Sequence, residues 1–362
     1  MPEMKDRYRD AANLCDSTVF WHRRRSPGEV LRALADAADE MDLDWDVYAE
    51  RGPVARLEEE LTQLLGTEGA AIFPSGTMAQ QAALRAWCDR AGTRRVAMPD
   101  IAHPLVHEQD GPRRLHGFEV EHLTVGPKVA TADDLAAIPG RLGAVLVELP
   151  LRDAGCALPS WDELTALSAA ARERGVALHA DGARIWEAQP YWDRPFAEVV
   201  ALFDSVYVSF YKGLGGLAGA ALAGPADFLT EARTWRSRMG GTIYHLTPEA
   251  IAGLVGLRDL LPRMPECLAW ARSLALEVSA VGITPNPTEP HTPTFLLHAA
   301  GDADEVNERV VAFLERERLN VSGLWRAGLE PGRITTEVMV SVAALEHDPA
   351  KVAARLAELV TG

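Results

Sequence analysis

Lysine is rare in this chain, and one lysine stands where an amine could do covalent chemistry. Only four occur among the 362 residues, whereas arginine supplies most of the positive charge. Lys212 lies between an apolar run and closely spaced glycines, in Ser209-Phe210-Tyr211-Lys212-Gly213-Leu214-Gly215-Gly216. A desolvated lysine amine can lose its proton and attack a carbonyl carbon to form a Schiff base, which a guanidinium cannot do. Two interpretations stay open: a nucleophile, or a solvated residue at the end of a strand.

Two further groups of residues could bind a charged ligand. Ser75, Gly76 and Thr77 follow an apolar run, and their hydroxyls and backbone N–H groups could hold a phosphate at the start of a helix or simply cap that helix. Asp181 ends another apolar run, where a carboxylate is costly unless a cation or a donor meets it. Arg184 could be that cation, or Asp181 could serve a bound molecule instead.

The elements that must position these groups alternate between strands and helices. We expect apolar strands at 70–73, 96–98, 144–149, 176–181, 205–210 and 219–223. We expect amphipathic helices at 27–41, 53–65, 77–90 and 161–174. This alternation predicts an α/β layer structure with a mostly parallel, mixed sheet. Ligands bind beyond the carboxyl ends of such strands, so residues 75–77, Asp181 and Lys212 would lie at one edge of the sheet. A phosphate-binding turn, an acid and an amine are the groups that bind pyridoxal phosphate.

The character of the chain changes after about residue 241. Helices are expected at 248–261, 265–280, 303–318 and 348–360, with a proline-rich passage at 283–293 and strands at 294–298 and 333–342. These elements predict a smaller α+β domain. The sequence therefore predicts an N-terminal segment 1–45, a large cofactor-binding domain 46–262 and a small C-terminal domain 263–362.

Composition excludes several other classes of protein. The formal net charge of −16 opposes a general affinity for nucleic acid or anionic lipid. No apolar stretch is long enough to cross a bilayer, and the first residues lack the apolar core of a signal peptide. The four cysteines are far apart and form no CxxC pair, which suggests neither a zinc site nor a disulfide framework. We expect a cytoplasmic protein without a metal site.

The order and spacing of the motifs resemble a known family. They are Ser-Gly-Thr at 75–77, Ala-His-Pro at 102–104, Asp-Gly-Ala-Arg at 181–184 and Lys-Gly-Leu-Gly at 212–215. The chain resembles the threonine aldolase/β-eliminating lyase family, whose members are pyridoxal-phosphate enzymes with the aspartate-aminotransferase fold. Matching stretches run from residue 46 to the strand that begins at residue 333.

The resemblance implies a role for each motif. Lys212 would carry the cofactor as an imine, Asp181 would pair with its pyridine nitrogen, and His103 would stack on its ring. Residues 75–77 would hold the phosphate. Arg184 is also expected to contact the cofactor.

The resemblance implies a substrate site as well. Arg184 and Arg333 would bind the substrate carboxylate, because a planar guanidinium can do so in bidentate fashion. Tyr48 would lie near the site, from the same or a neighbouring subunit, since family members are homodimers or homotetramers with shared active sites. Glu108 also fits the family pattern, without an assigned role.

Several positions depart from the family pattern on the substrate side. Asp16 and Ser17 stand where the family usually has Ser-Asp, so Ser17 would substitute for the substrate-binding serine. Tyr211 replaces a small hydroxyl residue before the lysine. Residues 149–153 replace Asn-Thr-His, whose histidine lies near the substrate hydroxyl, and Tyr244 stands where an arginine is usual.

The leading functional hypothesis is a carbon–carbon lyase that interconverts a β-hydroxy-α-amino acid with glycine and an aldehyde. The missing histidine favours an alternative, β-elimination or other chemistry at Cα–H, in which Lys212 itself removes the α-proton. A third possibility is a homologue that binds the cofactor without catalysis. A nucleotide-binding α/β protein is disfavoured, because neither a Walker A motif nor GxGxxG follows an expected strand.

Overall fold

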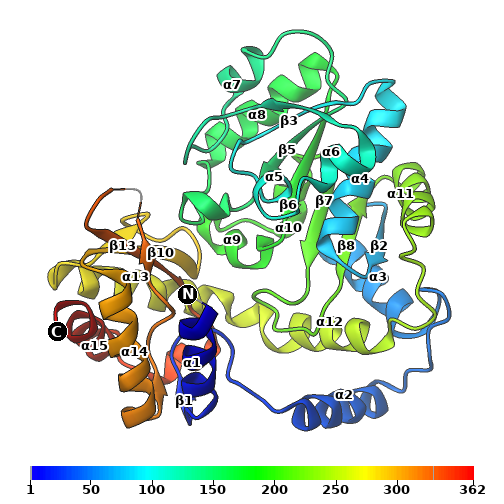
Figure 1. Ribbon diagram of the computed structural model, residues 1–362. Coiled ribbons are helices and arrows are strands. Elements are labelled where there is room, and N and C mark those ends of the chain that lie inside the picture. The colour runs from blue at the N-terminus through cyan, green and yellow to red at the C-terminus, as the bar shows by residue number, and fades with distance from the viewer. Residues whose placement is uncertain (1, 329) are drawn as a thin grey trace. The chain divides into compact units, whose positions relative to one another are not determined.

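The computed structural model describes residues 2–328 and 330–362 (Figure 1). By its contacts the chain forms two compact units. The large unit contains residues 30–154 and 158–261, and the small unit contains residues 2–29, 155–157 and 262–362. The domain boundaries expected from the sequence stay a prediction.

The large unit is built on one sheet of seven strands in the order β2-β8-β7-β6-β5-β3-β4. Only β8 runs antiparallel to its neighbours, so the sheet is mixed and mostly parallel, as expected. The strands are β2 Gly69–Phe73, β3 Arg95–Met98, β4 Glu119–His122, β5 Ala144–Glu148, β6 Ala177–Gly182, β7 Ser205–Ser209 and β8 Ala220–Gly224.

The central strands are buried on both faces, and this explains their continuous apolar runs. In β5, Ala144 and Leu146 belong to a core cluster that includes Leu84 from helix α4 (Gly76–Ala91). Their neighbours Val145 and Val147 point the other way, into a cluster shared with helices α7 (Ala132–Ala136) and α8 (Trp161–Arg174). Because successive side chains of a strand face opposite ways, helices cover both faces of the sheet and make three layers.

Local signals fix where the main helices begin and end. Helix α4 begins after Ser75, whose side chain caps it, and ends at Gly92 in the left-handed conformation (φ 67°). Helix α8 begins with a capping box at Ser160. The other helices of this region are α2 Pro27–Met41, α3 Gly52–Leu65, α5 His103–Val106, α6 Gly111–His116, α9 Ile185–Trp192, α10 Phe196–Val200, α11 Ala226–Arg238 and α12 Thr247–Asp259.

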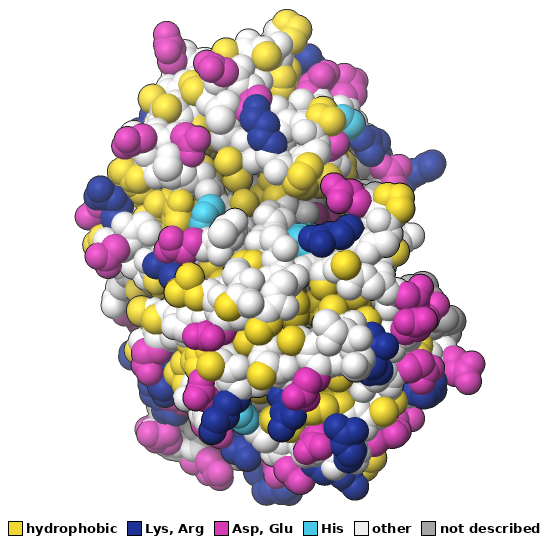
Figure 2. Space-filling model, turned by 90° about the vertical axis from the view of Figure 1, so that its left-hand side faces the viewer, with side chains coloured by type: hydrophobic (Ala, Val, Ile, Leu, Met, Phe, Trp, Pro, Cys, Tyr) yellow, Lys and Arg dark blue, Asp and Glu magenta, His cyan; other side chains and the backbone are white. Residues whose placement is uncertain are grey.

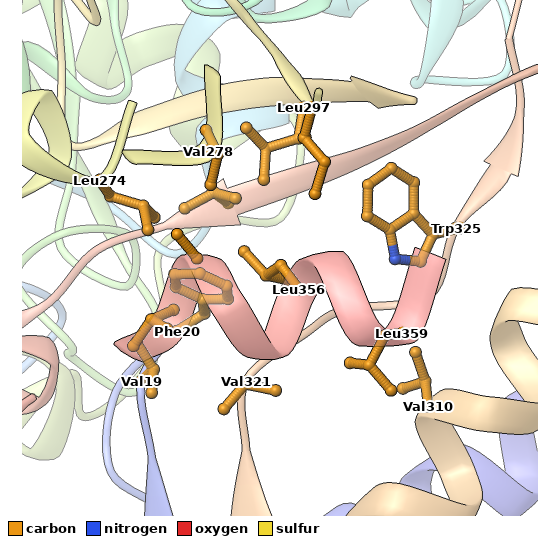
Figure 3. Packing of buried hydrophobic residues seen from close by; sticks show 14 of the residues in the cluster. Val19, Phe20, Leu274, Val278, Leu297, Val310, Val321, Trp325, Leu356 and Leu359 are labelled. Carbon is orange, nitrogen blue, oxygen red and sulfur yellow. The ribbon is translucent and has the colours of Figure 1, made fainter. Parts of the chain in front are cut away.

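The small unit contains an antiparallel sheet in the order β12-β13-β10-β9 and a short parallel pair, β1 with β11. Its strands are β1 Ser17–Thr18, β9 Thr284–Asn286, β10 Thr294–Ala300, β11 Leu319–Asn320, β12 Arg326–Ala327 and β13 Arg333–Met339. Its helices are α1 Pro2–Asn13, α13 Met264–Ala280, α14 Ala303–Glu317 and α15 Pro349–Thr361. Figure 3 shows Leu356 and Leu359 of α15 in the core of this unit, with Leu359 beside Val310 of α14.

The structure confirms the expected fold class and differs from the sequence-based prediction at some elements. The start of the chain forms helix α1, which was not predicted from the sequence; Ala11 of α1 is buried in the core of the small unit, and Arg7 pairs with Glu308 of α14 at 2.7 Å. Helix α11 was not predicted. The strand expected at 333–342 ends at Met339, because a 3-10 helix begins at Val342.

The surface and the helices agree with the composition. Figure 2 shows acidic and basic side chains interspersed among apolar ones on one face of the molecule, rather than gathered into one patch. Across residues 2–328 and 330–362, every helix is too short or too polar to span a membrane.

Candidate active site

A pocket lies in the large unit, where β5, β6 and β7 end and α4 begins. This is the edge of a parallel sheet at which ligands are expected. The predicted site residues that line it are Gly76, Thr77, His103, Asp181, Arg184 and Lys212.

The first wall of the pocket is the N-terminus of α4. Ser75 is the cap residue, and its Oγ accepts a hydrogen bond from Met78 N at 3.3 Å. Gly76 is required at the next position, since a Cβ there would stand 2.0 Å from the Tyr207 Oη. The backbone N–H groups of this first turn, together with the helix dipole, make an anion-binding site. Ser75 therefore caps the helix, and residues 76–77 present its positive end to the pocket.

Two buried carboxyl groups lie side by side at the ends of β5 and β6. Glu148 and Asp181 occupy paired positions in the sheet register, and their exposed fractions are 7% and 5%. Burial raises the pKa of Asp181 to about 6, although the Ala183 N–H at 3.1 Å opposes the shift. Burial, and next the charge of Asp181, raise the pKa of Glu148. The pair therefore holds a proton or meets a cationic ligand more readily than two separate carboxylates would.

Glu148 also anchors the segment that carries His103. Its carboxylate accepts hydrogen bonds from the backbone N–H of His103 and from that of Arg152, the latter at 3.2 Å. The His103 ring is partly exposed, and its Nδ1 lies 3.3 Å from Glu108 Oε1. Glu108 is almost fully buried and in turn accepts a hydrogen bond from Gln81 at 3.1 Å. Glu148 thus holds the backbone of His103, and Glu108 holds its imidazole ring.

Lys212 lies three residues beyond the end of β7, directly after Tyr211. Its Nζ lies 5.0 Å from the centre of the Tyr211 ring. The Tyr211 hydroxyl accepts a hydrogen bond from Tyr207, and burial raises the pKa of both phenols. The face of an aromatic ring attracts an ammonium group, so this contact holds the amine of Lys212 in the wall of the pocket.

Arg184 lies beyond the end of β6 and is 4% exposed. Its Nη1 donates to Glu187 Oε1 at 2.9 Å, and Glu187 is 1% exposed. Glu187, on the following helix, is therefore one partner of Arg184. A guanidinium carries five N–H donors in a planar fork, a geometry suited to a carboxylate or a phosphate.

The comparisons with known proteins identify the family. The family model described as Beta-eliminating lyase matches residues 28–301. The chain belongs to this family. A solved structure from Exiguobacterium, assigned as an aromatic amino acid beta-eliminating lyase/threonine aldolase, is 36% identical, with a TM-score of 0.91 over 98% of this chain and 99% of that one. A protein from Listeria monocytogenes assigned as an L-allo-threonine aldolase is 33% identical, with a TM-score of 0.91 over 99% of both chains.

Curated relatives agree with the structural ones. Low-specificity L-threonine aldolase 1 of Arabidopsis thaliana is 29% identical over 255 residues, which are 67% of this chain and 70% of that protein. The chain is a pyridoxal-phosphate-dependent lyase of the Beta-eliminating lyase family.

The pocket fits this cofactor on its own evidence. A buried acid ends the central strand, a lysine follows the next strand, and a long helix directs its N-terminus to the same space. The Nε2 of Gln80, in the pocket wall, is buried and has no hydrogen-bond partner in the described structure. These groups match a ring nitrogen, an aldehyde and a phosphate.

Three predicted substrate residues are not among those that line this pocket: Tyr48, which belongs to the large unit, and Ser17 and Arg333, which belong to the small unit. Tyr48 is 54% exposed, and its backbone N–H donates to Tyr244 O at 2.9 Å. Its neighbour Asp46 is fully buried and accepts hydrogen bonds from Thr247 Oγ1 at 2.6 Å and Leu246 N at 2.9 Å. Ser17 and Arg333 belong to the small unit, and their roles stay predictions.

Sequence reasoning missed other residues that line the pocket. Gln80 looked like an ordinary helix residue, and Tyr207 like an ordinary strand residue. Glu148 was noted only as a landmark before the departure at 149–153, although a charged residue closing an apolar strand is the same signal that identified Asp181. Arg152 lines the pocket at the departure itself, where the family usually has Asn-Thr-His.

Proposed function

We propose that the enzyme interconverts a β-hydroxy-α-amino acid with glycine and an aldehyde. The observation that carries the proposal is the convergence of Lys212, Asp181 and the N-terminus of α4 on one pocket. The relatives named above include threonine aldolases, which supports this reaction class.

The cofactor supplies an aldehyde that condenses with amines and a ring that withdraws electrons from Cα of the substrate. Lys212 supplies the amine that holds the cofactor and, once released, a base within the pocket. Asp181 keeps the proton on the ring nitrogen, because a carboxylate beside that nitrogen favours its charged form. Gly76 and Thr77 bind the phosphate through backbone N–H groups and the Thr77 hydroxyl.

The chain's other residues orient the substrate and exchange its proton. Arg184 binds the substrate carboxylate, with Arg333 and Ser17 as further contacts. His103 stacks against the cofactor ring. Because Glu108 holds Nδ1 of His103, the Nε2 atom is the one that takes the proton of the substrate β-hydroxyl when the Cα–Cβ bond breaks.

We further propose a homodimer or homotetramer in the cytoplasm. Tyr48, Tyr244 and Trp45 are all more than half exposed and lie close together, Tyr48 packing edge-on against Tyr244 at 5.1 Å. Exposed aromatic side chains of this kind are typical of subunit contacts. The four cysteines, all within the described residues, form no disulfide bonds, which fits a reducing compartment.

The test is a comparison of wild type with Lys212→Ala and Lys128→Ala after purification with pyridoxal phosphate. Lys128 is a matched control, since it is 55% exposed and pairs with Asp134 at 2.6 Å. Wild type and Lys128→Ala should be yellow and release glycine and an aldehyde from L-threonine or phenylserine. Lys212→Ala should lose turnover and keep no cofactor after borohydride reduction and denaturation.

Two outcomes would contradict the proposal. Release of ammonia and a keto acid from serine, without aldehyde from threonine or phenylserine, would assign β-elimination instead. A yellow protein that turns over none of these amino acids would assign a binding protein without catalysis.

A further inference from the structure

A line of buried polar side chains leads from Asp181 into the layer between α4 and the sheet. Gln80 Oε1 lies 2.7 Å from His179 Nε2, and His179 Nδ1 lies 2.8 Å from Ser205 Oγ. The indole Nε1 of Trp87 donates to the same Ser205 Oγ at 2.8 Å. His179 and Ser205 are paired positions on β6 and β7, and Gln80 and Trp87 are seven residues, or two turns, apart on α4. The line therefore begins and ends on α4 and passes through one residue of β6 and one of β7.

The direction of this line follows from the atoms that meet at its two ends. An indole N–H can only donate, so the Ser205 oxygen accepts from Trp87 and keeps its own hydrogen for another acceptor. Burial lowers the pKa of His179 to about 3, so the ring is neutral and carries one N–H. Because Nε2 faces the amide oxygen of Gln80, which can only accept, we place that N–H on Nε2, and the bare Nδ1 accepts from the Ser205 hydroxyl. That N–H donates to Gln80 Oε1, which fixes the amide of Gln80.

The far end of the fixed amide is Gln80 Nε2, which faces the site. This nitrogen is buried and makes no hydrogen bond of normal geometry in the described structure. It nevertheless lies close enough to Asp181 to lower the pKa of that carboxyl. A buried donor without a normal partner is costly, and here the nearby acceptor is the acid that serves the cofactor.

We propose that Trp87, Ser205 and His179 are positioning residues that fix the Gln80 amide with its Nε2 toward Asp181, and so keep Asp181 an ionised acceptor for the cofactor's ring nitrogen. The inference rests on the role proposed above for Asp181. If the line ran the other way, the amide oxygen of Gln80 would face the carboxylate, and two acceptors would repel each other. That repulsion disfavours the reversed arrangement, and the Trp87 N–H, which occupies one lone pair of Ser205, leaves the Ser205 hydroxyl hydrogen available to His179 Nδ1.

Several groups compete over the charge of Asp181. The charge of Glu108 opposes the ionised form of Asp181. Glu148, from β5, lies beside Asp181, and the charge of Asp181 in turn raises the pKa of Glu148. The phenols of Tyr207 and Tyr211 also lie within electrostatic range. The Ala183 N–H, His103 and Gln80 favour the carboxylate. Removal of the Gln80 donor therefore raises the pKa of Asp181, and the acid is lost to protonation at a higher pH.

The experiment measures the affinity for pyridoxal phosphate from pH 5.5 to 9 in wild type, Gln80→Leu and Trp87→Phe. Loss of a hydrogen bond to a charged group should weaken binding at pH 6 on the order of tenfold in Gln80→Leu, and far less at pH 9, where Asp181 is ionised in both proteins. Trp87→Phe keeps an aromatic ring and should shift the profile in the same direction, by less. Trp192→Phe is the matched control, since the Trp192 indole donates to Pro159 O at 3.0 Å elsewhere in the fold.

A second measurement uses the cofactor-free protein. Nitrogen-15 NMR of the histidine rings, with His179→Gln to assign the signals, should show His179 with a bare Nδ1 and a protonated Nε2 throughout that pH range. The proposal is wrong if Nδ1 carries the proton, or if the affinity profile of Gln80→Leu superimposes on that of wild type. A wild-type protein that fails to bind pyridoxal phosphate at all would instead overturn the proposed function.

Discussion

Replacement of Gly76 by alanine tests the architecture of the end of the site at which we propose that the phosphate binds. An ideal Cβ at this position would lie 2.0 Å from the Oη of Tyr207 and 2.6 Å from its Cζ, far inside ordinary contact. Tyr207 is 4% exposed and lies on β7, inside the sheet, so its ring has little room to move. Gly76 itself does not have a positive φ, and alanine would otherwise suit the first turn of a helix.

The two effects have opposite signs, and their magnitudes decide the outcome. Overpacking of a close-packed core costs about 1–3 kcal/mol. The reduced freedom of alanine in the unfolded chain returns about 0.4–1 kcal/mol. We therefore expect Gly76→Ala to lower the free energy of unfolding by about 1–2 kcal/mol. Displacement of the phenol across the α4 N-terminus should also weaken pyridoxal phosphate binding on the order of tenfold, equivalent to ~1.4 kcal/mol.

Urea unfolding of the cofactor-free protein and a cofactor titration measure the two effects. Gly69→Ala is a matched control, because a Cβ there would meet only the flexible end of Leu229 at 3.0 Å. The double variant Gly76→Ala/Tyr207→Phe should recover part of the stability, since it removes the nearest atom. If Gly76→Ala is as stable as wild type and binds the cofactor equally well, the close approach of Gly76 and Tyr207 is wrong.

Three further perturbations have defined outcomes. Glu187→Gln should lower the free energy of unfolding by about 3 kcal/mol in urea titrations, because it removes the carboxylate that pairs with buried Arg184; a change below 1 kcal/mol would contradict this. Since folding raises the pKa of Asp181 to about 6 and that of Glu148 to about 8, the contribution of this pair to the stability of the cofactor-free protein should be complete below the ordinary carboxyl pKa and be lost as the pH rises through about 6 to 8; Glu148→Gln should flatten that part of the pH profile of the free energy of unfolding, and equal slopes would refute it. Arg333→Lys should raise the KM for the amino acid on the order of tenfold with a smaller change in kcat, because lysine cannot bind a carboxylate in bidentate fashion; an unchanged KM would remove Arg333 from the substrate site.

The sequence predicted the site where local signals coincide with the rules of parallel sheets. Asp181 and Lys212 were found because each ends or follows an apolar strand, and the carboxyl ends of parallel strands share an edge. Glu148 satisfies the same local signal, but its importance depends on register, since only the pairing of β5 with β6 puts it beside Asp181. Gln80 carries no local signal at all, because an amide inside a helix is ordinary until its neighbours are known.

The elements that sequence reasoning missed owe their structure to packing. Helix α1 is strongly polar and forms where it can dock on α14, through pairs such as Arg7 with Glu308 that are remote in the chain. Helix α11 has a similarly polar composition and buries Phe228 and Leu229 in a cluster with β2 and β8. Short polar helices of this kind are marginal alone, so periodicity gives little warning of them.

The loop that displays Tyr48 is stiff in spite of its exposure. Tyr48, Ala49 and Arg51 all have positive φ values, between 55° and 66°, and the buried carboxylate of Asp46 holds the backbone on either side. Residues with side chains adopt this conformation only when their surroundings enforce it. The conformational entropy of this loop is lost when the chain folds, so a second subunit that bound to it would not have to order it. Assembly would then gain in speed and selectivity from a feature fixed within each chain on its own.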